Sequence, residues 1–214
     1  TGTVIIDKKT YELDTDGSLK DYTPKKKSSK KKSSGKSDTS DKSGTSTAKK
    51  SVALTFDDGP SSFTDRLLDC LEENNAKATF FMVGTEIASF PDEVKRMKKL
   101  GCELGNHTYD HKDLATLSSD EISSEIARVD EQLVNLTGEG ASVVRPPYGS
   151  VNDTVKSTVG TPMILWSIDT LDWKTQDVES TVEEVMHNVK DGSIILMHDI
   201  FSTSVDAAEI LIPQ

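Results

Sequence analysis

The chain has 214 residues, of which 25 are basic and 36 acidic, so its formal charge at pH 7 is −11. This length suits one domain with an appendage, and no run of 18 or more apolar residues occurs, so we expect no membrane-spanning helix. The first 50 residues carry a net charge of +6 and the remaining 164 carry −17, which argues against nucleic-acid binding by the acidic main part.

The first fifty residues are predicted to be an appendage in two parts. Residues 1–23 hold two short β-like runs, too few to fold alone, and are interpreted as the stub of a preceding extracellular region. Residues 24–50 contain 10 Lys and 11 Ser or Thr, so little apolar surface is available to offset ordering, and a disordered linker is expected. The favoured interpretation is an extended spacer, and the alternative is a tether along an anionic surface such as a cell wall. The chain starts at Thr1 without an apolar signal segment, which suggests a processed or cut chain.

From residue 51 onward, apolar β-like runs alternate with helical patterns. Strands are expected at 51–56, 78–83, 102–105, 143–145, 163–168 and 193–197. Helices are expected at 63–75, 92–100, 118–136, 151–159 and 178–190, the third opened by a Ser-Ser-Asp-Glu capping box. Such alternation predicts one α/β domain over 51–214, with a parallel sheet closed into a barrel. In parallel barrels the chemistry lies on the loops that follow the strands.

Acidic and histidine side chains follow the first and third predicted strands. Asp57 and Asp58 leave the first strand together, although an ordinary Asp-Gly turn would explain them alone. His107 and His111 follow the third strand, and two His four apart on one side of a helical turn can reach one ion. Asp58, His107 and His111 would form a two-His, one-carboxylate set with open positions, which suits a divalent metal that activates water.

Further polar side chains follow the later strands. Arg145 precedes two prolines and can hold a carboxylate, Asp172 and Trp173 lie in an acidic loop, and His198 ends the last strand. Each has an ordinary structural explanation, but their joint placement after five successive strands favours a catalytic site. His187, within a predicted helix, is expected to be exposed and inert.

Five motifs, TFDDGP, NHTYDH, RPPYG, DTLDW and LMH, occur in this order and resemble those of the NodB-like polysaccharide deacetylases, carbohydrate esterase family 4. The resemblance covers residues 48–214 and implies a distorted (β/α)7-type barrel that removes acetyl groups from N-acetylated sugars. It also implies one divalent ion, Zn²⁺ first, with Co²⁺, Mn²⁺ or Ni²⁺ as alternatives. Family members usually continue past the last motif with a helix and one more strand, so the C-terminal unit is expected to be truncated.

The resemblance assigns roles to the motif residues. It implies that Asp57 is the general base, that Asp58, His107 and His111 bind the metal, and that Arg145 orients Asp57. The backbone N–H of Tyr148 would stabilise the oxyanion.

For the last two motifs, the resemblance implies that His198 is the general acid, held by Asp172. Trp173 and Leu196 would line the pocket for the acetyl methyl group, and Tyr148 and Trp173 would contact the sugar.

The expected substrate is N-acetylglucosamine in peptidoglycan, with chitin oligomers second and O-acetylated xylan third. The protein is expected to act as a monomer outside the cell or at a bacterial cell wall. A non-catalytic glycan-binding barrel is the remote alternative, and loss of a base or ligand, its signature, is absent from these motifs. Cys70 and Cys102 are expected to be free thiols, since Cys70 lies on an apolar helix face.

Overall fold

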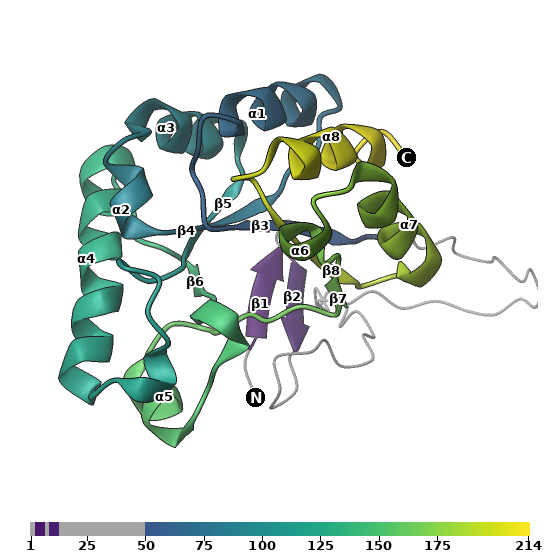
Figure 1. Cartoon of the computed structure of the whole chain (residues 1–214). Coiled ribbons are helices and arrows are strands. Elements are labelled where there is room, and N and C mark those ends of the chain that lie inside the picture. The colour runs from purple at the N-terminus through teal and green to yellow at the C-terminus, as the bar shows by residue number, and fades with distance from the viewer. Residues whose placement is uncertain (1–2, 7–8, 13–49) are drawn as a thin grey trace, which may run out of the picture.

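The structure is a computed structural model that describes residues 3–6, 9–12 and 50–214 (Figure 1). Strands β1 (Thr3–Ile6) and β2 (Lys9–Glu12) pair antiparallel, with Thr3 opposite Glu12. The predicted linker at 24–50 lies outside the described residues except for its last residue, so the division into stub, linker and domain stays a prediction.

Six parallel strands form the central sheet, in the order β6-β5-β4-β3-β8-β7. Their bounds are β3 Ala53–Asp57, β4 Thr79–Met82, β5 Glu103–Asn106, β6 Val143–Val144, β7 Ile168–Asp169 and β8 Ile194–His198. In the middle of the sheet, β3 pairs with β8 so that Asp57 lies beside His198. Because all strands are parallel, their carboxyl ends meet at one edge, as the sequence predicted.

Helices lie around the outside of the strands (Figure 1). They are α1 Thr64–Glu73, α2 Gly84–Ile87, α3 Pro91–Leu100, α4 Ser119–Thr137, α5 Asp153–Thr158, α6 Asp172–Thr175, α7 Val178–Asn188 and α8 Ser202–Leu211, with short 3-10 turns η1 Leu114–Thr116 and η2 Pro147–Gly149. The capping box of α4 is confirmed, since the side chains and N–H groups of Ser118 and Glu121 bond reciprocally. The short helices α2 and α6 and the terminal helix α8 were not expected from the sequence.

The sheet is closed by the segment 162–169, where the predicted strand at 163–168 is wrong over most of its length. At its start, Val144 donates to Pro162 O (2.9 Å) and accepts from Ile164 N–H (2.8 Å). At its end, Ser167 N–H donates to Ile194 O (2.9 Å) and β7 pairs with β8. The segment therefore crosses from β6 to β8 and joins the two edges of the sheet, which gives the distorted barrel that the resemblance implied.

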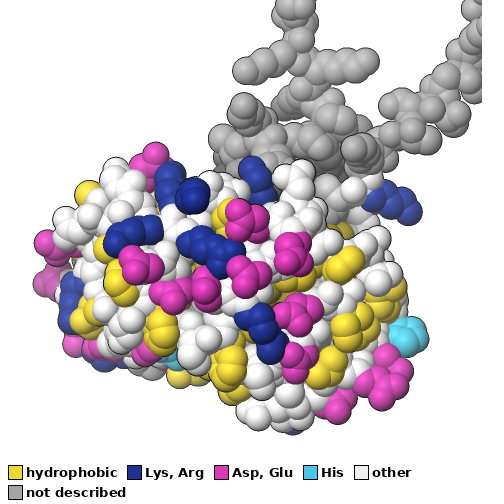
Figure 2. All heavy atoms as spheres, turned by 90° about the horizontal axis from the view of Figure 1, so that it is seen from above, with side chains coloured by type: hydrophobic (Ala, Val, Ile, Leu, Met, Phe, Trp, Pro, Cys, Tyr) yellow, Lys and Arg dark blue, Asp and Glu magenta, His cyan; other side chains and the backbone are white. Residues whose placement is uncertain are grey.

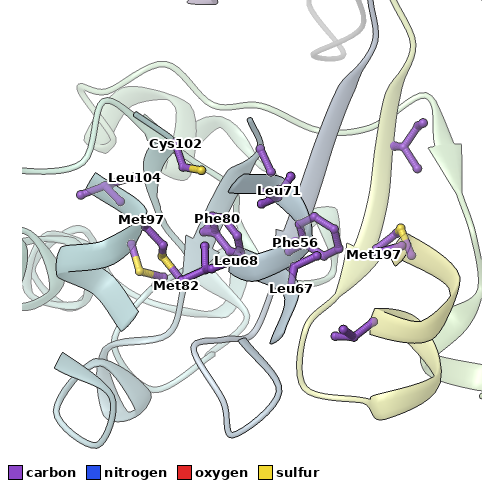
Figure 3. Close-up of a cluster of buried hydrophobic side chains, with 14 of the residues drawn as sticks. Phe56, Leu67, Leu68, Leu71, Phe80, Met82, Met97, Cys102, Leu104 and Met197 are labelled. Carbon is purple, nitrogen blue, oxygen red and sulfur yellow. The ribbon is translucent and has the colours of Figure 1, made fainter. Parts of the chain in front are cut away.

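The main apolar core lies between the sheet and helices α1 and α3 (Figure 3). The rings of Phe56 and Phe80 stack at 5.5 Å between centroids, which fixes β3 against β4. Side chains from α1, α3 and β8 pack around these rings, and residues of α4, α7 and α8 extend the cluster: Leu67, Leu68, Leu71, Met97, Met197, Val129, Leu133, Val185, Val205, Ala208 and Leu211. Cys70 and Cys102 are both buried and free, as expected.

Ion pairs join the helices on the outer surface above this core. Figure 2 views the molecule from this side, where basic and acidic side chains alternate. Arg96 of α3 pairs with three acidic residues of α1: Asp65, Asp69 and Glu72. Arg66 of α1 pairs with Asp206 and Glu209 of α8, and this contact ties the C-terminal helix to the body.

In the part of the chain that the structure describes, no helix is both long and apolar enough to cross a bilayer.

Packing of α4 on the barrel can be tested at Leu133, whose side chain is fully buried. Leu133→Ala is expected to lower the free energy of unfolding by about 2–5 kcal/mol, because it removes apolar contacts and leaves a cavity. Guanidinium unfolding measures this change. Val134→Ala, on the neighbouring exposed position, is the control, with an expected change within about 0.5 kcal/mol. Equal effects at the two positions would show that α4 does not pack as described.

Candidate active site

The polar residues singled out in the sequence meet at the carboxyl edge of the sheet. Asp57 and His198 are the last residues of β3 and β8. His107 directly follows β5, and Arg145 directly follows β6. Four strands of one sheet thus place a carboxylate, two imidazoles and a guanidinium at the same edge.

Asp58, His107 and His111 form a group that fits a metal ion, with one ligand atom from each lying within 4.8 Å of the others. The Asp58 Oδ1 atom lies 3.4 Å from His107 Nε2 and 3.2 Å from His111 Nε2. This oxygen is buried and accepts no hydrogen bond from the residues that the structure describes. His107 Nδ1 lies 2.6 Å from the carbonyl oxygen of Arg145, to which it donates when protonated, so the Nε2 lone pair faces Asp58. Two imidazoles and one carboxylate are a common donor set for Zn²⁺ and similar ions.

The charge state of Asp58 also suits a metal ligand. Burial alone would raise the pKa of this carboxyl group, but its contacts with His107 and His111 outweigh burial and hold the pKa well below its ordinary value. Asp58 is therefore an anion over the whole physiological pH range.

The two histidines are brought together by an irregular loop, so the helical turn expected at 107–111 is wrong. Thr108 and His111 have positive φ angles of 68° and 54°, which a helix does not contain. Asp58 shares this conformation, with φ at 72°. Non-glycine residues adopt it at a cost of about 1–3 kcal/mol each and keep it only where surrounding contacts enforce it. The ligand geometry therefore depends on what holds the loop.

Arg145 is completely buried and holds Asp57. Its Nη1 atom donates to Asp57 Oδ1 (2.6 Å) and to Thr55 Oγ1 (2.7 Å). Burial lowers the pKa of Arg145, and the adjacent Asp57 opposes that change. The other oxygen of Asp57, Oδ2, lies 3.6 Å from His107 Nε2. One face of the Asp57 carboxylate is thus fixed by Arg145 while the other faces the metal-binding group.

Arg145 also binds the segment that closes the barrel. Its Nε and Nη2 atoms donate to the carbonyl oxygens of Ile164 and Leu165, both at 3.0 Å. These bonds explain why 163–168 is not a regular strand, since its central carbonyls bond to a side chain. The guanidinium carbon lies 4.0 Å from the centroid of the Phe81 ring, a cation–π contact.

His198 and Asp172 form a buried pair. His198 Nδ1 lies 2.8 Å from Asp172 Oδ1, and the His198 N–H donates to Oδ2 at 2.8 Å. Burial disfavours the charged imidazolium, but Asp172 more than offsets it and, with Asp57 and Asp58, raises the pKa of His198 to about 9. His198 is therefore protonated at neutral pH, and Asp172 occupies Nδ1, which leaves Nε2 as the atom that can meet a substrate.

Sequence analysis gave no role to two buried residues, Thr55 inside the first motif and Asp199 directly after the last. Thr55 accepts a hydrogen bond from Arg145, and the alternation of side chains along a strand could have indicated it, because residues 55 and 57 share one face of β3.

Asp199 is fully buried, and burial raises its pKa to about 7. Its carboxylate accepts from Thr64 Oγ1. A Cβ atom at Gly59 would lie 2.1 Å from Asp199 Oδ1, so glycine is needed for the turn after Asp58 to pack there. No pattern in the sequence separates Asp199 from a solvated loop aspartate.

The remaining predicted residues divide into exposed and buried ones. Tyr148 and Trp173 are 70% and 48% exposed, and the Tyr148 ring lies 4.9 Å from that of His111. Tyr148 has φ at 61°, within a turn whose hydrogen bonds are donated by the two residues after it. Leu196 is buried within β8. His187 is exposed on α7, as expected.

Comparison with known proteins agrees with this geometry. A family profile described as polysaccharide deacetylase matches residues 44–161. The chain is 42% identical over 156 residues to a peptidoglycan-N-acetylglucosamine deacetylase of Listeria monocytogenes, covering 72% of this chain and 34% of that protein. It is 39% identical over 167 residues to the Bacillus subtilis peptidoglycan-N-acetylmuramic acid deacetylase PdaC, covering 78% and 36%. The chain thus spans about a third of the length of these two relatives.

Solved structures give the same result. The structure of PdaC from Bacillus subtilis superposes with a TM-score of 0.75 at 40% identity, over 76% of this chain and 81% of that one. A structure titled as a T48 deacetylase with substrate gives a TM-score of 0.74 at 44% identity, over 76% and 82% of the two chains.

The origin of the raised pKa of His198 can be tested with Asp172→Asn in the metal-free chain. We expect the pKa to fall by about 1–2, because a hydrogen bond to a charged group contributes about 1.5–3 kcal/mol and one pKa unit corresponds to about 1.4 kcal/mol. The pKa of His198 falls because the variant lacks the anion that stabilises the imidazolium. NMR titration of the ring measures it. Asp177→Asn, at the start of α7, removes a remote carboxylate and should leave the pKa unchanged; equal behaviour of both variants would refute the assignment.

Proposed function

The chain belongs to the polysaccharide deacetylase family, and on that premise we propose that it hydrolyses the N-acetyl amide bond of a glycan in a metal-dependent reaction. The observation that carries the proposal is the Asp57 carboxylate, fixed by buried Arg145 and facing the Asp58, His107 and His111 group. A base held beside a metal-binding group is what hydrolysis of an unreactive amide requires.

The proposed substrate is peptidoglycan N-acetylglucosamine, because relatives of this chain are named as peptidoglycan deacetylases. One of them is named for N-acetylmuramic acid, so either sugar of this polymer fits the names. Chitin oligomers and O-acetylated xylan are the alternatives. A relative named as a bifunctional xylanase/deacetylase keeps xylan in the comparison.

The proposed metal is Zn²⁺, held by Asp58, His107 and His111, with Co²⁺, Mn²⁺ or Ni²⁺ as substitutes. When bound, the ion supplies Lewis acidity that polarises the acetyl carbonyl group and makes water a stronger acid. Asp58, an anion at neutral pH, is already in the protonation state that such an ion needs.

Asp57 acts as the general base in this proposal. It takes a proton from the attacking water as the oxygen of that water bonds to the acetyl carbon. Arg145 keeps Asp57 Oδ1 in place, which leaves Oδ2 for the proton. The backbone N–H of Tyr148 would donate to the oxygen that becomes negative in the tetrahedral intermediate.

His198 acts as the general acid. Its Nε2–H gives a proton to the amide nitrogen as the carbon–nitrogen bond breaks, so that acetate and a free amine leave. Asp172 keeps the ring oriented and charged until that moment. The exposed rings of Tyr148 and Trp173 would contact the sugar, and Trp173 with Leu196 would line the acetyl pocket.

The setting of the reaction completes the proposal. Residues 51–214 form the catalytic domain, and the lysine-rich linker at 24–50 gives it reach, with a contact to anionic cell-wall polymer as the alternative role. The enzyme acts at or outside the bacterial cell wall as a monomer.

Substrate choice is tested by acetate release. The metal-free chain is incubated with peptidoglycan, N-acetylglucosamine oligomers and acetyl-xylan, each with and without added Zn²⁺ or Co²⁺. We expect metal-dependent release from peptidoglycan to be the fastest. Release from xylan alone would assign the chain to the esterases. No release from any polymer by a metal-loaded chain would favour the glycan-binding alternative.

The roles of base and ligand are separated by two variants. Asp57→Asn is expected to keep one bound metal but to lower kcat about 10²–10⁴-fold, the usual contribution of a general base. His107→Ala is expected to lose the metal together with the activity. Metal content by elemental analysis and acetate release are measured on the same samples. Full activity of Asp57→Asn, or unchanged metal content of His107→Ala, would each contradict the assignment.

A further inference from the structure

Glu125 of α4 is a buried carboxylate that lies outside the catalytic group. Only 4% of the residue is exposed. Its Oε2 atom accepts from the backbone N–H groups of Tyr109 and Asp110, both at 2.9 Å. Its Oε1 atom lies 3.0 Å from Lys112 Nζ. Both N–H groups belong to the loop between the two histidines.

This loop has no regular structure of its own, so it needs external contacts. Thr108 and His111 hold left-handed conformations on either side of Tyr109 and Asp110. The loop carbonyls of Thr108 and Tyr109 accept from the N–H groups of Gly84 and Thr85 (3.0 and 3.1 Å) at the start of α2. The carbonyl groups of this loop therefore accept hydrogen bonds from α2, and its N–H groups donate hydrogen bonds to Glu125 of α4.

Helix α4 also holds the Tyr109 ring. The Arg128 guanidinium carbon lies 3.2 Å from the centroid of that ring. Gly84 also packs against this ring, since an added Cβ there would lie 2.4 Å from Tyr109 Cδ2. The middle of the loop is thus fixed in both its backbone and its side chain.

The two histidines differ in what orients them. His107 is held directly, by the bond from its Nδ1 to the Arg145 carbonyl oxygen. His111 follows the strained loop, and its side chain is 29% exposed. Its position depends on the loop more than that of His107 does.

We propose that Glu125 is a positioning residue that sets the loop 108–111 so that His111 Nε2 meets the metal bound by His107 and Asp58. The inference rests on the proposed metal site. Glu125 acts mainly through its Oε2 atom, which accepts two N–H bonds, so the position of this oxygen matters more than the pairing of Oε1 with Lys112. An outer hydrogen bond that orients a ligand typically changes metal affinity 10–100-fold.

The test is Co²⁺ binding to the full chain after removal of metal, followed by calorimetry and by the visible spectrum of the bound ion. Glu125→Ala is expected to raise the Kd about 10–100-fold and to change the spectrum as His111 leaves the ligand set. Glu125→Asp keeps the charge but withdraws the oxygen by one methylene, and it should weaken binding as well. Glu125→Gln keeps an oxygen for the two N–H groups but loses the pair with Lys112, so it should recover most of the binding that Ala loses and the wild-type spectrum.

Two controls on the same helix separate positioning from general destabilisation. Glu131→Ala removes an exposed carboxylate and should leave the Kd unchanged. Leu133→Ala lowers global stability without touching the loop and should also leave the Kd unchanged. If Glu125→Ala misfolds, the Asp and Gln variants carry the comparison.

The outcomes distinguish this proposal from the proposed function. If wild type binds one Co²⁺ and the Ala and Asp variants bind it equally well, Glu125 has no positioning role. If the Gln variant binds as weakly as Ala, the effect comes from charge and the proposal is wrong. If wild type itself binds no metal, the proposed function fails first.

Discussion

The buried guanidinium of Arg145 is the interaction on which barrel and site both depend. Removing this charge from water costs several kcal/mol, which only complete pairing can offset. The structure provides that pairing through Asp57, Thr55 and the carbonyls of Ile164 and Leu165. These partners come from β3 and from the segment that closes the barrel. The backbone carbonyl of Arg145 also orients His107, so one residue links the closed sheet, the proposed base and a proposed metal ligand.

Two separate ion pairs, Arg145 with Asp57 and Asp172 with His198, lie at the site. On one side, Arg145 holds Asp57 in a fixed ion pair. On the other side, Asp172 keeps His198 positively charged. Among the described contacts, Asp58 has neither a lysine nor an arginine partner and faces the two histidines His107 and His111 instead. The proposed base and acid, Asp57 and His198, thus lie side by side at the ends of β3 and β8 with oppositely charged partners, an arrangement that suits paired proton transfers.

Sequence patterns predicted the sheet and the strand-end residues because both follow from local periodicity and from the geometry of parallel strands. Asp57 and His198 are examples, since the end of an apolar run places each one. The patterns failed where tertiary contacts override local preference. The segment 163–168 is apolar, but its carbonyls bond to Arg145 instead of a strand. The loop from His107 to His111 has helical spacing, yet contacts from α2 and α4 hold it in left-handed conformations, and nothing in the spacing reveals those partners. Asp199 was missed for the same reason.

The pairing of β3 with β8 has a consequence for how the chain can fold while it is being synthesised. Asp57 and His198 are neighbours in the sheet, but 140 residues separate them in sequence. Asp58, His107 and His111 leave the ribosome long before β8 does. Until β8 emerges, one side of β3 is an unpaired strand edge. Asp57 and His198, the proposed base and acid, therefore meet only after nearly all of residues 51–214 have been synthesised. Nascent chains halted before β8 would carry an exposed apolar strand and depend on holding factors to avoid aggregation.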